Sequence, residues 1–231
     1  MAEKNTINGC SECPSRWKNF EFLTKKEMGM VNENRYEAVF KPGEIIIKQN
    51  SPASNALFLL SGLAKVYIEG LKGRNFIMSI AKPGRMIMGP GVYVNSRHTY
   101  TVSAITAVQA CFINFDIFRH LVRTNGAFAE SLIKDISMKS LRTHTRMVNL
   151  AHKKMPGRLA EILLYFADDI YNKNDFEMLL SRQELGEMTN MAKESTVRIL
   201  KEFEESGIIQ LNSAGIKILD KEKLILISEK G

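Results

Sequence analysis

Long apolar runs are missing from this chain of 231 residues. A membrane-spanning helix needs about 20 mainly apolar residues, whereas the strongest apolar runs here, Ala56–Leu60 and Ile208–Leu211, have only the length of a strand. The first residues also lack the basic-then-apolar order of a secretory signal. With 45% hydrophobic and 25% charged residues, the composition indicates a globular cytoplasmic protein without a membrane partner, rather than a disordered chain.

Cysteine is scarce as well, because the chain has three: Cys10, Cys13 and Cys111. Three cysteines are too few for a disulfide framework, and the cytoplasm keeps thiols reduced. Cys10 and Cys13 have the spacing that lets two thiolates reach one metal ion, but a single Cys-x-x-Cys is a weak signal. The cysteines alone therefore leave their role open.

Enzyme motifs are absent too. The sequence contains no Gly-x-Ser-x-Gly, no His-Glu-x-x-His and no phosphate-binding Gly-x-x-x-x-Gly-Lys-Ser/Thr. The four histidines, His98, His120, His144 and His152, do not have the spacing of a metal site. We therefore expect a protein that is not an enzyme.

The charge is positive overall, with 32 Lys+Arg against 25 Asp+Glu and a formal net charge of +7. Basic residues neutralise phosphates, so this excess is compatible with nucleic-acid binding. From His152 onward, however, acidic residues outnumber basic ones, and the positive charge belongs to the preceding part of the chain. Whether the chain binds nucleic acid must therefore be judged from the placement of individual charges.

Between about Glu37 and Phe115 the sequence alternates short apolar runs with glycine or proline, as in Lys41-Pro-Gly-Glu-Ile-Ile-Ile47 and Lys65-Val-Tyr-Ile-Glu-Gly70. Strands at short, regular spacing with turn signals between them are typical of an antiparallel sandwich or roll. We predict an all-β, barrel-like domain within residues 1–126.

The pattern changes after this domain, and no glycine or proline interrupts the chain from Phe128 to about Ala151. Apolar and small residues recur there at steps of three or four, which predicts a long helix with a narrow seam of coiled-coil type. Such a seam is expected to pair with a second copy of the chain; the alternative is that it packs on the β-domain. The predicted contact residues of this dimerisation helix, residues 127–151, are Leu132, Ile136, Thr143, Met147 and Leu150.

A hinge is expected near Ala151 to Met155, because Pro156 is well placed as the first residue of a new helix. Further on, Ser181-Arg-Gln-Glu184 is a capping box, the signature of a helix start. Leu185 and Met188 supply the apolar face of that helix.

A second helix is predicted from about Ala192 to Glu205, and Gly207 ends it. Two short apolar runs, 208–211 and 216–219, flank Asn212-Ser-Ala-Gly215 and predict a hairpin. A hairpin after two such helices is the arrangement of a winged helix, which we place in residues 156–228.

The second helix carries residue types suited to the major groove of DNA. Lys193, Glu194, Val197, Arg198 and Lys201 lie opposite the predicted core positions. Arginine can make two parallel hydrogen bonds to guanine, and glutamate can accept one from the cytosine amino group. The alternative is an ordinary surface ion pair between Glu194 and Arg198 on a solvated helix, and the following hairpin favours the DNA-binding interpretation.

At this point a family resemblance is visible. The segments Ser181-Arg-Gln-Glu-Leu-Gly-Glu-Met188 and Lys193–Ile209 closely resemble the recognition motif of the CRP/FNR family of bacterial transcription regulators. The stretch from Lys41-Pro-Gly-Glu-Ile-Ile-Ile47 to Ser61-Gly-Leu-Ala-Lys-Val-Tyr67 resembles that family's cyclic-nucleotide-binding β-roll. The resemblance implies an α+β fold: an antiparallel β-roll of cupin-like, cyclic-nucleotide-binding type, a long dimerisation helix and a winged helix-turn-helix. It also implies a homodimer that binds near-palindromic double-stranded DNA and contacts RNA polymerase.

The resemblance also assigns roles to single residues. Glu194 and Arg198 match the family's base-reading residues, while Arg182, Lys193 and Ser195 match positions that touch phosphate or flanking bases. Val197 departs from the glycine or serine that is usual there, so the half-site is defined only as a G·C-containing core. A competing function is a small-molecule-binding protein whose helical region contacts other proteins.

The effector site departs from the nucleotide-binding members. Pro90, between Gly89 and Gly91, replaces the ribose-binding glutamate, and His98, before Thr99, stands where the phosphate-binding arginine is expected. We therefore do not expect cyclic AMP to bind in the usual way. An unknown small-molecule effector could use these residues together with two on the long helix, or the pocket could be vestigial, with His98 a satisfied polar side chain. The two helix residues are Thr143 and His144.

The cysteines gain a meaning from the resemblance. Oxygen-sensing members hold an iron-sulfur cluster with N-terminal cysteines and one late in the β-roll, and Cys10, Cys13 and Cys111 match three of these ligands, whereas Asn19 occupies the remaining position. The alternatives are three thiolates with an outside ligand, a labile cluster, a zinc site, a redox thiol pair, an ancestral remnant, or cysteine as a small buried hydrophobe.

Overall fold

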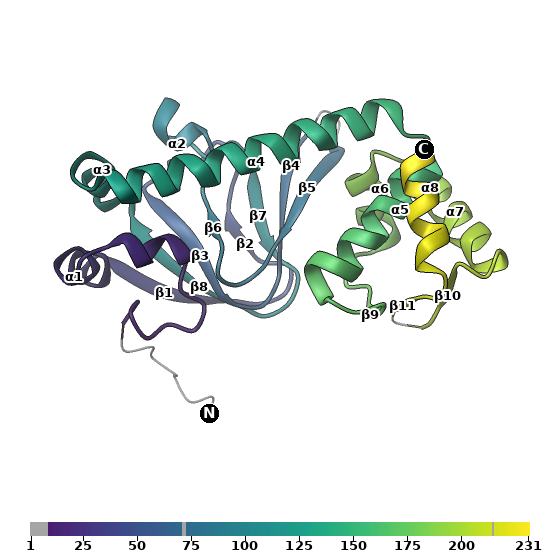
Figure 1. Ribbon diagram of the computed structural model, residues 1–231, viewed down its shortest axis with the longest axis horizontal. Helices are drawn as coiled ribbons and strands as arrows, with labels where there is room; N and C mark the ends of the chain where they lie inside the picture. The colour runs from purple at the N-terminus through teal and green to yellow at the C-terminus, as the bar shows by residue number, and fades with distance from the viewer. Residues whose placement is uncertain (1–8, 71–72, 214) are drawn as a thin grey trace. The chain divides into compact units, whose positions relative to one another are not determined.

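The computed structural model describes residues 9–70, 73–213 and 215–231 (Figure 1). The chain divides into two compact units. Unit 1 comprises Met1–Ile68 and Ile80–Lys139, and unit 2 comprises Glu69–Ser79 and Ser140–Gly231. Within the described residues, no helix is both long enough and apolar enough to cross a membrane.

Unit 1 begins with two short helices that the sequence patterns did not predict, the 3-10 helix η1 (Lys18–Phe22) and α1 (Lys25–Glu33). A capping box fixes the start of α1: the Thr24 hydroxyl accepts from the backbone N–H of Glu27, and the Glu27 carboxylate accepts from the backbone N–H of Thr24. This exchange satisfies two N–H groups that a helix start leaves without partners.

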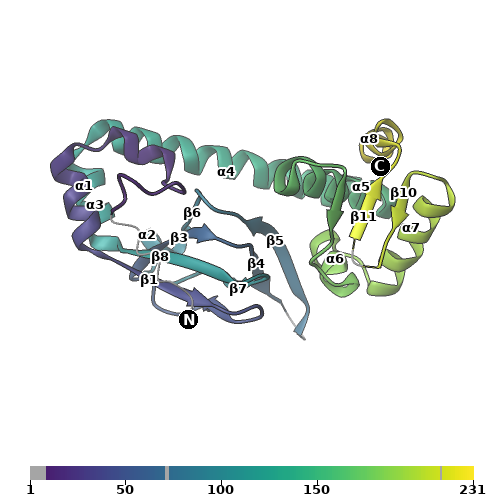
Figure 2. The ribbon, with the colours of Figure 1, turned by 90° about the horizontal axis from the view of Figure 1, so that it is seen from below.

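Among the described residues, the strands β1 to β8 form two antiparallel sheets, as the glycine and proline punctuation predicted (Figure 2). Most of their residues belong to unit 1, but residues 75–79 of β5 belong to unit 2. One sheet has the order β1-β8-β3-β6 and the other β2-β7-β4-β5. The strands are β1 (Arg35–Phe40), β2 (Ile45–Ile47), β3 (Asn55–Ser61), β4 (Ala64–Glu69), β5 (Asn75–Ala81), β6 (Met86–Ile87), β7 (Thr101–Ala104) and β8 (Val108–Asn114).

Strand β3 separates two apolar cores. Leu57 and Leu59 belong to one core and Phe58 to the other, because successive side chains of a strand point to opposite faces. The second core is rich in aromatic rings: Trp17 packs edge-on against Phe128, with ring centroids 5.9 Å apart. The N-terminal segment is therefore an integral part of unit 1.

Three further helices are α2 (Gly91–Val94), α3 (Phe115–Thr124) and α4 (Gly126–His152). The short helix α2 was not predicted, whereas α4 confirms the long helix predicted from residue 128 to about 151. Asn125 Oδ1 accepts from the backbone N–H of Phe128 at 3.0 Å and fixes the start of α4.

The predicted seam of α4 needs one correction. Leu132 is 4% exposed and belongs to the aromatic core of unit 1, so it is not free to contact a second copy. Ile136 and Met147 are 48% and 62% exposed. Packing on the β-domain, the alternative left open by the sequence, therefore covers Leu132 of the predicted seam but leaves Ile136 and Met147 exposed.

Unit 2 contains the predicted two helices and hairpin together with elements that the sequence patterns missed. The missed elements are strand β9, which pairs with β11 to give the sheet order β10-β11-β9, and helix α8. Pro156 lies one position later than predicted, as the second residue of α5. The elements are α5 (Met155–Tyr165), the π-helical turn η3 (Phe166–Tyr171), β9 (Asp175–Glu177), α6 (Arg182–Thr189), α7 (Lys193–Glu205), β10 (Ile209–Leu211), β11 (Gly215–Ile218) and α8 (Lys221–Lys230).

Candidate nucleic-acid interface and sensor pockets

Local contacts fix both the start of α6 and the turn that joins α6 to α7. The predicted capping box at the start of α6 is present, since Ser181 and Glu184 each accept a hydrogen bond from the other's backbone N–H. At the end of α6, Asn190 adopts a left-handed conformation, which asparagine tolerates better than most residues. A Cβ atom on Gly186 would lie 2.7 Å from the carbonyl oxygen of Met191, so this close approach requires glycine.

Helix α7 has two distinct faces, as predicted. Its buried side packs into the core of unit 2 through Thr196, Ile199, Leu200 and Phe203. On the other side, Lys193, Glu194, Arg198 and Lys201 are exposed and Val197 is half-buried. The N-cap residue Ala192 makes no side-chain cap, so the first N–H groups of α7 stay available to an anion such as a phosphate.

Arg198 forms an ion pair with Glu202, one turn further along α7. The surface pair with Glu194 that the sequence left open is therefore not the one formed, and within the described residues the Glu194 carboxylate has no hydrogen-bond or ion-pair partner. The Arg198 side chain is 57% exposed and that of Glu202 47%, so the pair is solvated and contributes about 0.3–0.5 kcal/mol. Arg198 can leave it for a base at small cost.

Two other predicted contact residues are half-buried. Arg182 is the first residue of α6, and burial lowers the pKa of its guanidinium from the usual value. Because arginine is effectively always protonated in proteins, Arg182 can contact a phosphate as a cation. Ser195 lies in the first turn of α7 beside Glu194.

The hairpin of β10 and β11, called the wing below, is tied directly to α7. The backbone N–H of Leu211 donates to the Glu204 carboxylate at 2.9 Å. Lys217 on β11 is exposed. The wing therefore holds a defined position relative to the exposed face of α7.

A residue that the sequence patterns missed, Arg146 of α4, supports the end of α6. Its guanidinium donates to the carbonyl oxygen of Met188 at 2.7 Å, to that of Ile77 at 2.8 Å and to that of Met78, all in unit 2. The guanidinium carbon also lies 5.2 Å from the ring centroid of Phe76. Met188 is near the C-terminus of α6, where carbonyl groups lack partners and a positive charge is favourable.

Replacing Arg146 by alanine is expected to destabilise unit 2 by about 2–3 kcal/mol, because each lost hydrogen bond to a charged group costs about 1.5–3 kcal/mol and water replaces part of it. Arg146→Lys keeps the charge but not the forked geometry and should lie between wild type and Arg146→Ala. Thermal unfolding followed by circular dichroism measures the effect, with Arg142→Ala, an exposed position on the same helix, as control. Equal melting temperatures for Arg146→Ala and Arg142→Ala would refute the structural role.

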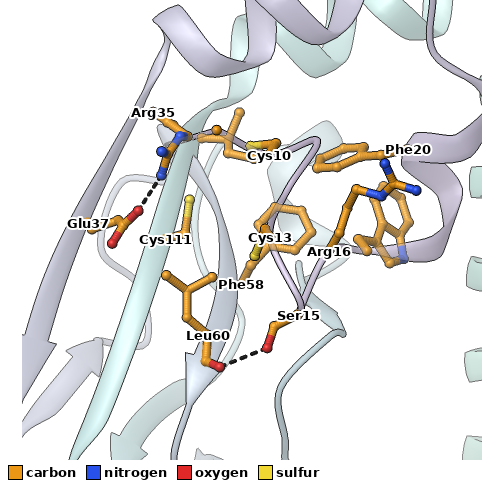
Figure 3. Close-up of a pocket in the computed structure, with 13 residues that line it drawn as sticks. Cys10, Cys13, Ser15, Arg16, Phe20, Arg35, Glu37, Phe58, Leu60 and Cys111 are labelled. Carbon is orange, nitrogen blue, oxygen red and sulfur yellow. Dashed lines mark hydrogen bonds and ion pairs between the residues drawn. The ribbon is translucent and has the colours of Figure 1, made fainter. Parts of the chain in front are cut away.

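The three cysteines converge on one pocket of unit 1 (Figure 3). Cys10 and Cys13 come from the N-terminal segment and Cys111 from β8, where it pairs with Glu37 of β1 in the strand register. The remaining lining includes the ion pair of Arg35 with Glu37 and the aromatic residues of the neighbouring core. The cavity measures about 20 Å³, which is room for about one water molecule.

Burial governs the chemistry of these thiols. It raises the pKa of Cys10 and raises that of Cys111 to about 11, although the guanidinium of Arg35 lowers both. Since a free thiol ionises near pH 8.5, both groups are protonated at neutral pH. Cys13 is only half-buried.

An iron-sulfur cluster requires four ligands, as a rule thiolates, and the residues present do not fit one. The fourth position, Asn19, is buried, and its amide nitrogen has no hydrogen-bond partner in the described part of the chain. Among residues 9–70, 73–213 and 215–231, no group of three His, Cys, Asp or Glu side chains is arranged to hold a metal ion. The same observation argues against a zinc site, and no chemical step through a metal follows.

Iodoacetamide at neutral pH is expected to modify Cys13 before Cys10 and Cys111, because alkylation requires an accessible thiolate. Raising the pH toward 11 should accelerate the reaction of Cys111, whose pKa of about 11 places its ionisation there. Mass spectrometry of peptides after timed quenching measures the order. Urea-unfolded protein, in which all three thiols should react at similar rates, is the control, and equally fast labelling of Cys111 and Cys13 in folded protein would contradict the burial.

The predicted effector pocket is tightly packed around Gly89 and Gly91, at the start of α2. A Cβ atom on Gly91 would lie 2.2 Å from the carbonyl oxygen of Arg97, and one on Gly89 would lie 3.0 Å from Thr99 Oγ1. Arg97, the cation next to His98, is exposed and donates to the carbonyl oxygen of Asn50 at 2.6 Å. This arrangement does not fit the cyclic phosphate of a nucleotide, which needs a cation and backbone amides in a dry pocket.

His98 is buried, as the vestigial-pocket alternative requires, but it is not fully satisfied. Its Nδ1 atom has no hydrogen-bond partner in the described part of the chain, and burial lowers the pKa of the imidazole. Thr143 and His144, the other two predicted pocket residues, belong to unit 2 and are exposed on α4.

Comparison with known protein families places both parts of the chain. Residues 37–125 match the family model of the cyclic nucleotide-binding domain, and residues 157–227 match that of the Crp-like helix-turn-helix domain. Together the two models span most of the chain in the order that the sequence resemblance implied.

Individual relatives agree with the family models. The CRP-like cAMP-activated global transcriptional regulator of Mycobacterium tuberculosis is 22% identical over 189 residues, covering 80% of this chain and 84% of that protein. The cAMP-activated global transcriptional regulator CRP of Salmonella typhimurium is 25% identical over 177 residues, covering 75% of this chain and 84% of that protein.

Solved structures share the fold. FixK2 from Bradyrhizobium japonicum superposes with a TM-score of 0.76 at 18% identity, covering 84% of this chain and 96% of that one. A putative transcriptional regulator of the crp/fnr family from Eubacterium rectale gives a TM-score of 0.77 at 18% identity, covering 92% and 98%. With its β-roll, long helix and two-faced recognition helix, the chain belongs to the CRP/FNR family of transcription regulators, which are DNA-binding proteins and not enzymes.

Proposed function

We propose that this regulator binds a near-palindromic DNA site with the α7 helices of two copies, one in each half-site. Glu194 and Arg198 read bases, while Arg182, Lys193 and Ser195 contact phosphates or flanking bases. The observation that carries the proposal is the division of α7 into a buried face and a charged, exposed face at the end of a fixed turn. A helix presented in this way enters the major groove with its N-terminal residues at the base edges.

Regulators of this family are dimers, and α4 is the proposed contact in this chain. Its later part exposes a series of large apolar side chains, which a monomer in water would leave uncovered. Ile136, Thr143, Met147 and Leu150 follow one stripe, and Ile133 lies beside it, whereas Met138 lies on the opposite side of the helix. The exposed apolar side chains of α4 are Ile133, Ile136, Met138, Leu141, Met147 and Val148.

Residues 1–126 are the proposed sensor domain, 127–151 the dimerisation helix and 156–228 the DNA-binding domain. The curated relatives named above are described as cAMP-activated. Here Pro90, His98 and the outward-turned Arg97 argue against cyclic AMP in the usual position, so we infer a different effector or a redox signal at the β-roll. Once bound to DNA, the dimer contacts RNA polymerase and alters transcription.

The test is selection of bound fragments from random double-stranded DNA by the purified full chain. We expect an enriched site with two related half-sites whose centres lie about one helical turn apart. Affinity for the selected site should also fall steeply with salt, as phosphate contacts require. Enrichment of no sequence, or retention of DNA without sequence preference, would overturn the proposal in favour of a protein-binding role for the helical unit.

A further inference from the structure

The N-terminal segment connects the cysteine pocket to the long helix α4 within unit 1. Trp17 Nε1 donates to Asp135 Oδ2 of α4 at 3.1 Å, and the Trp17 ring packs against Phe128 of the same helix. The segment is fastened to the sheet as well, because the Ser15 hydroxyl donates to the carbonyl oxygen of Leu60 at 2.8 Å. Cys10 and Cys13 therefore lie just before two residues that attach the N-terminal segment to the sheet and to α4.

We propose that Cys10 and Cys13 are a redox-active dithiol whose oxidation to a disulfide changes the DNA affinity of the regulator through Trp17 and α4. The oxidant is a hydroperoxide such as hydrogen peroxide. The Cys13 sulfur attacks one peroxide oxygen, giving a sulfenic acid and one water; the Cys10 sulfur then displaces the hydroxyl group, which leaves as a second water. Two thiols thus lose two electrons and two protons, and one peroxide becomes two waters.

The structure distinguishes this pair from the other possible pairs. Cys13 is the half-buried member and the one that an oxidant reaches first. Cys10 lies in the preceding turn, which the hydrogen bond from Glu12 N to the carbonyl oxygen of Gly9 closes at 3.3 Å and which ends one residue before Cys13. Cys111 is held in β8 between β1 and β3 and is buried, so it can neither meet the oxidant nor move toward Cys13.

The surroundings favour the chemistry as well. The guanidinium of Arg35 stands at the pocket beside Cys10 and Cys111 (Figure 3). This cation opposes the effect of burial on Cys10 and so favours the anionic form of the resolving sulfur, which attacks in the second step. The backbone N–H of Cys10 donates to Asn32 Oδ1 at 2.7 Å, which keeps Cys10 in place as the resolving thiol.

A change at Cys13 has a short path to α4. Arg16 N donates to the carbonyl oxygen of Cys13 at 3.0 Å, and Phe20 N donates to that of Trp17 at 3.0 Å, so consecutive turns join the thiol to the tryptophan. A disulfide between Cys10 and Cys13 constrains the backbone that joins them, and the hydrogen-bonded turns transmit this change to Trp17. Because Trp17 is hydrogen-bonded to Asp135, a displacement of Trp17 reaches α4, the proposed dimerisation helix.

The experiment uses the full chain purified without oxygen and then treated with hydrogen peroxide. Intact mass should fall by about two mass units, one disulfide, and peptide mapping should join Cys10 to Cys13. Trp17 is the single tryptophan of the chain, so its fluorescence should change with the same time course. Affinity for the selected DNA site should change by about fivefold or more and return with a dithiol reductant.

Matched variants separate the steps. Cys111→Ser should keep the disulfide and the DNA response, Cys13→Ser should lose both, and Asp135→Ala should keep the disulfide and lose the DNA response. A Cys10–Cys111 disulfide, a metal-containing coloured protein, or a disulfide without any change in DNA affinity would each overturn the proposal. It rests on the proposed function only for its DNA readout: if the reduced protein selects no DNA sequence, the proposed function fails, while mass and fluorescence still decide the dithiol.

Discussion

Arg198→Ala should abolish the sequence preference of the dimer while leaving weak, non-specific DNA binding in place. A bidentate arginine–guanine contact is worth about 1–3 kcal/mol of discrimination, and a dimer makes it twice. The loss is therefore about 2–6 kcal/mol, roughly 30-fold to 25,000-fold in the affinity ratio between the selected site and scrambled DNA. Fluorescence anisotropy titrations with the two DNA fragments measure this ratio directly.

Lys201→Ala is the matched control for this experiment. Lys201 lies on the same exposed face of α7, one turn after Val197, but a lysine there is expected to meet phosphate and not bases. Its loss should lower the affinity for both DNA fragments about equally. It should also reduce the number of counterions released on binding by about one per copy of the chain. A preserved affinity ratio in Arg198→Ala, or a collapsed one in Lys201→Ala, would show that base reading lies elsewhere.

The ion pair of Arg198 with Glu202 bears on this result. Glu202→Ala removes the partner that holds Arg198 in the free protein, yet an exposed i,i+4 pair contributes only a few tenths of a kcal/mol. The discrimination measured for Arg198 should therefore come almost entirely from the DNA. Glu194 differs because no such pair has to be broken before it can accept from a cytosine amino group.

The helix-turn-helix could be predicted from the sequence because its determinants are local. A capping box spans four residues, and an apolar stripe repeats every three or four residues. The roles of Ser181, Leu185 and Ile199 could therefore be predicted from their neighbours in the sequence alone. The structure confirms all three: the cap is formed and both apolar residues are buried. The same holds for the length of α4.

What the sequence could not show depends on contacts between distant segments. The hydrogen bond from Trp17 to Asp135 joins residues 118 positions apart, and no periodicity in the sequence predicts it. Leu132 fits the predicted seam as well as Ile136 does, and only the fold reveals that the aromatic core covers the first and not the second. The strand β9 was overlooked because three residues, Asp175–Glu177, are too few to show alternation.

The chemistry of the cysteine pocket and of His98 also depends on contacts that the sequence could not show. The sequence identified Cys10, Cys13 and Cys111 as partners, and they do line one pocket. It could not show that burial keeps Cys10 and Cys111 protonated or that the cavity holds no more than about one water. Likewise His98 was recognised as unusual, but the missing partner of its Nδ1 atom emerged only from the packing.

Converting two seam residues of α4 to glutamate, in the double variant Ile136→Glu, Met147→Glu, is expected to dissociate the dimer. Burying each large apolar side chain contributes about 1.5–3 kcal/mol, and a two-fold interface contains every residue twice. The loss is about 6 kcal/mol or more, which raises the dimer dissociation constant by roughly 25,000-fold or more. Sedimentation velocity over a range of concentrations measures it.

Met138→Glu is the control, because Met138 is 47% exposed on the same helix but lies two residues from Ile136 and thus about 200° around the axis, off the stripe. It should remain dimeric, and circular dichroism should show intact helix in all variants. Dissociation by Met138→Glu, or dimers persisting in the double variant, would place the interface on another face. Because two half-sites bind together only through the dimer, the double variant should also lose high-affinity DNA binding while its recognition helix stays chemically intact.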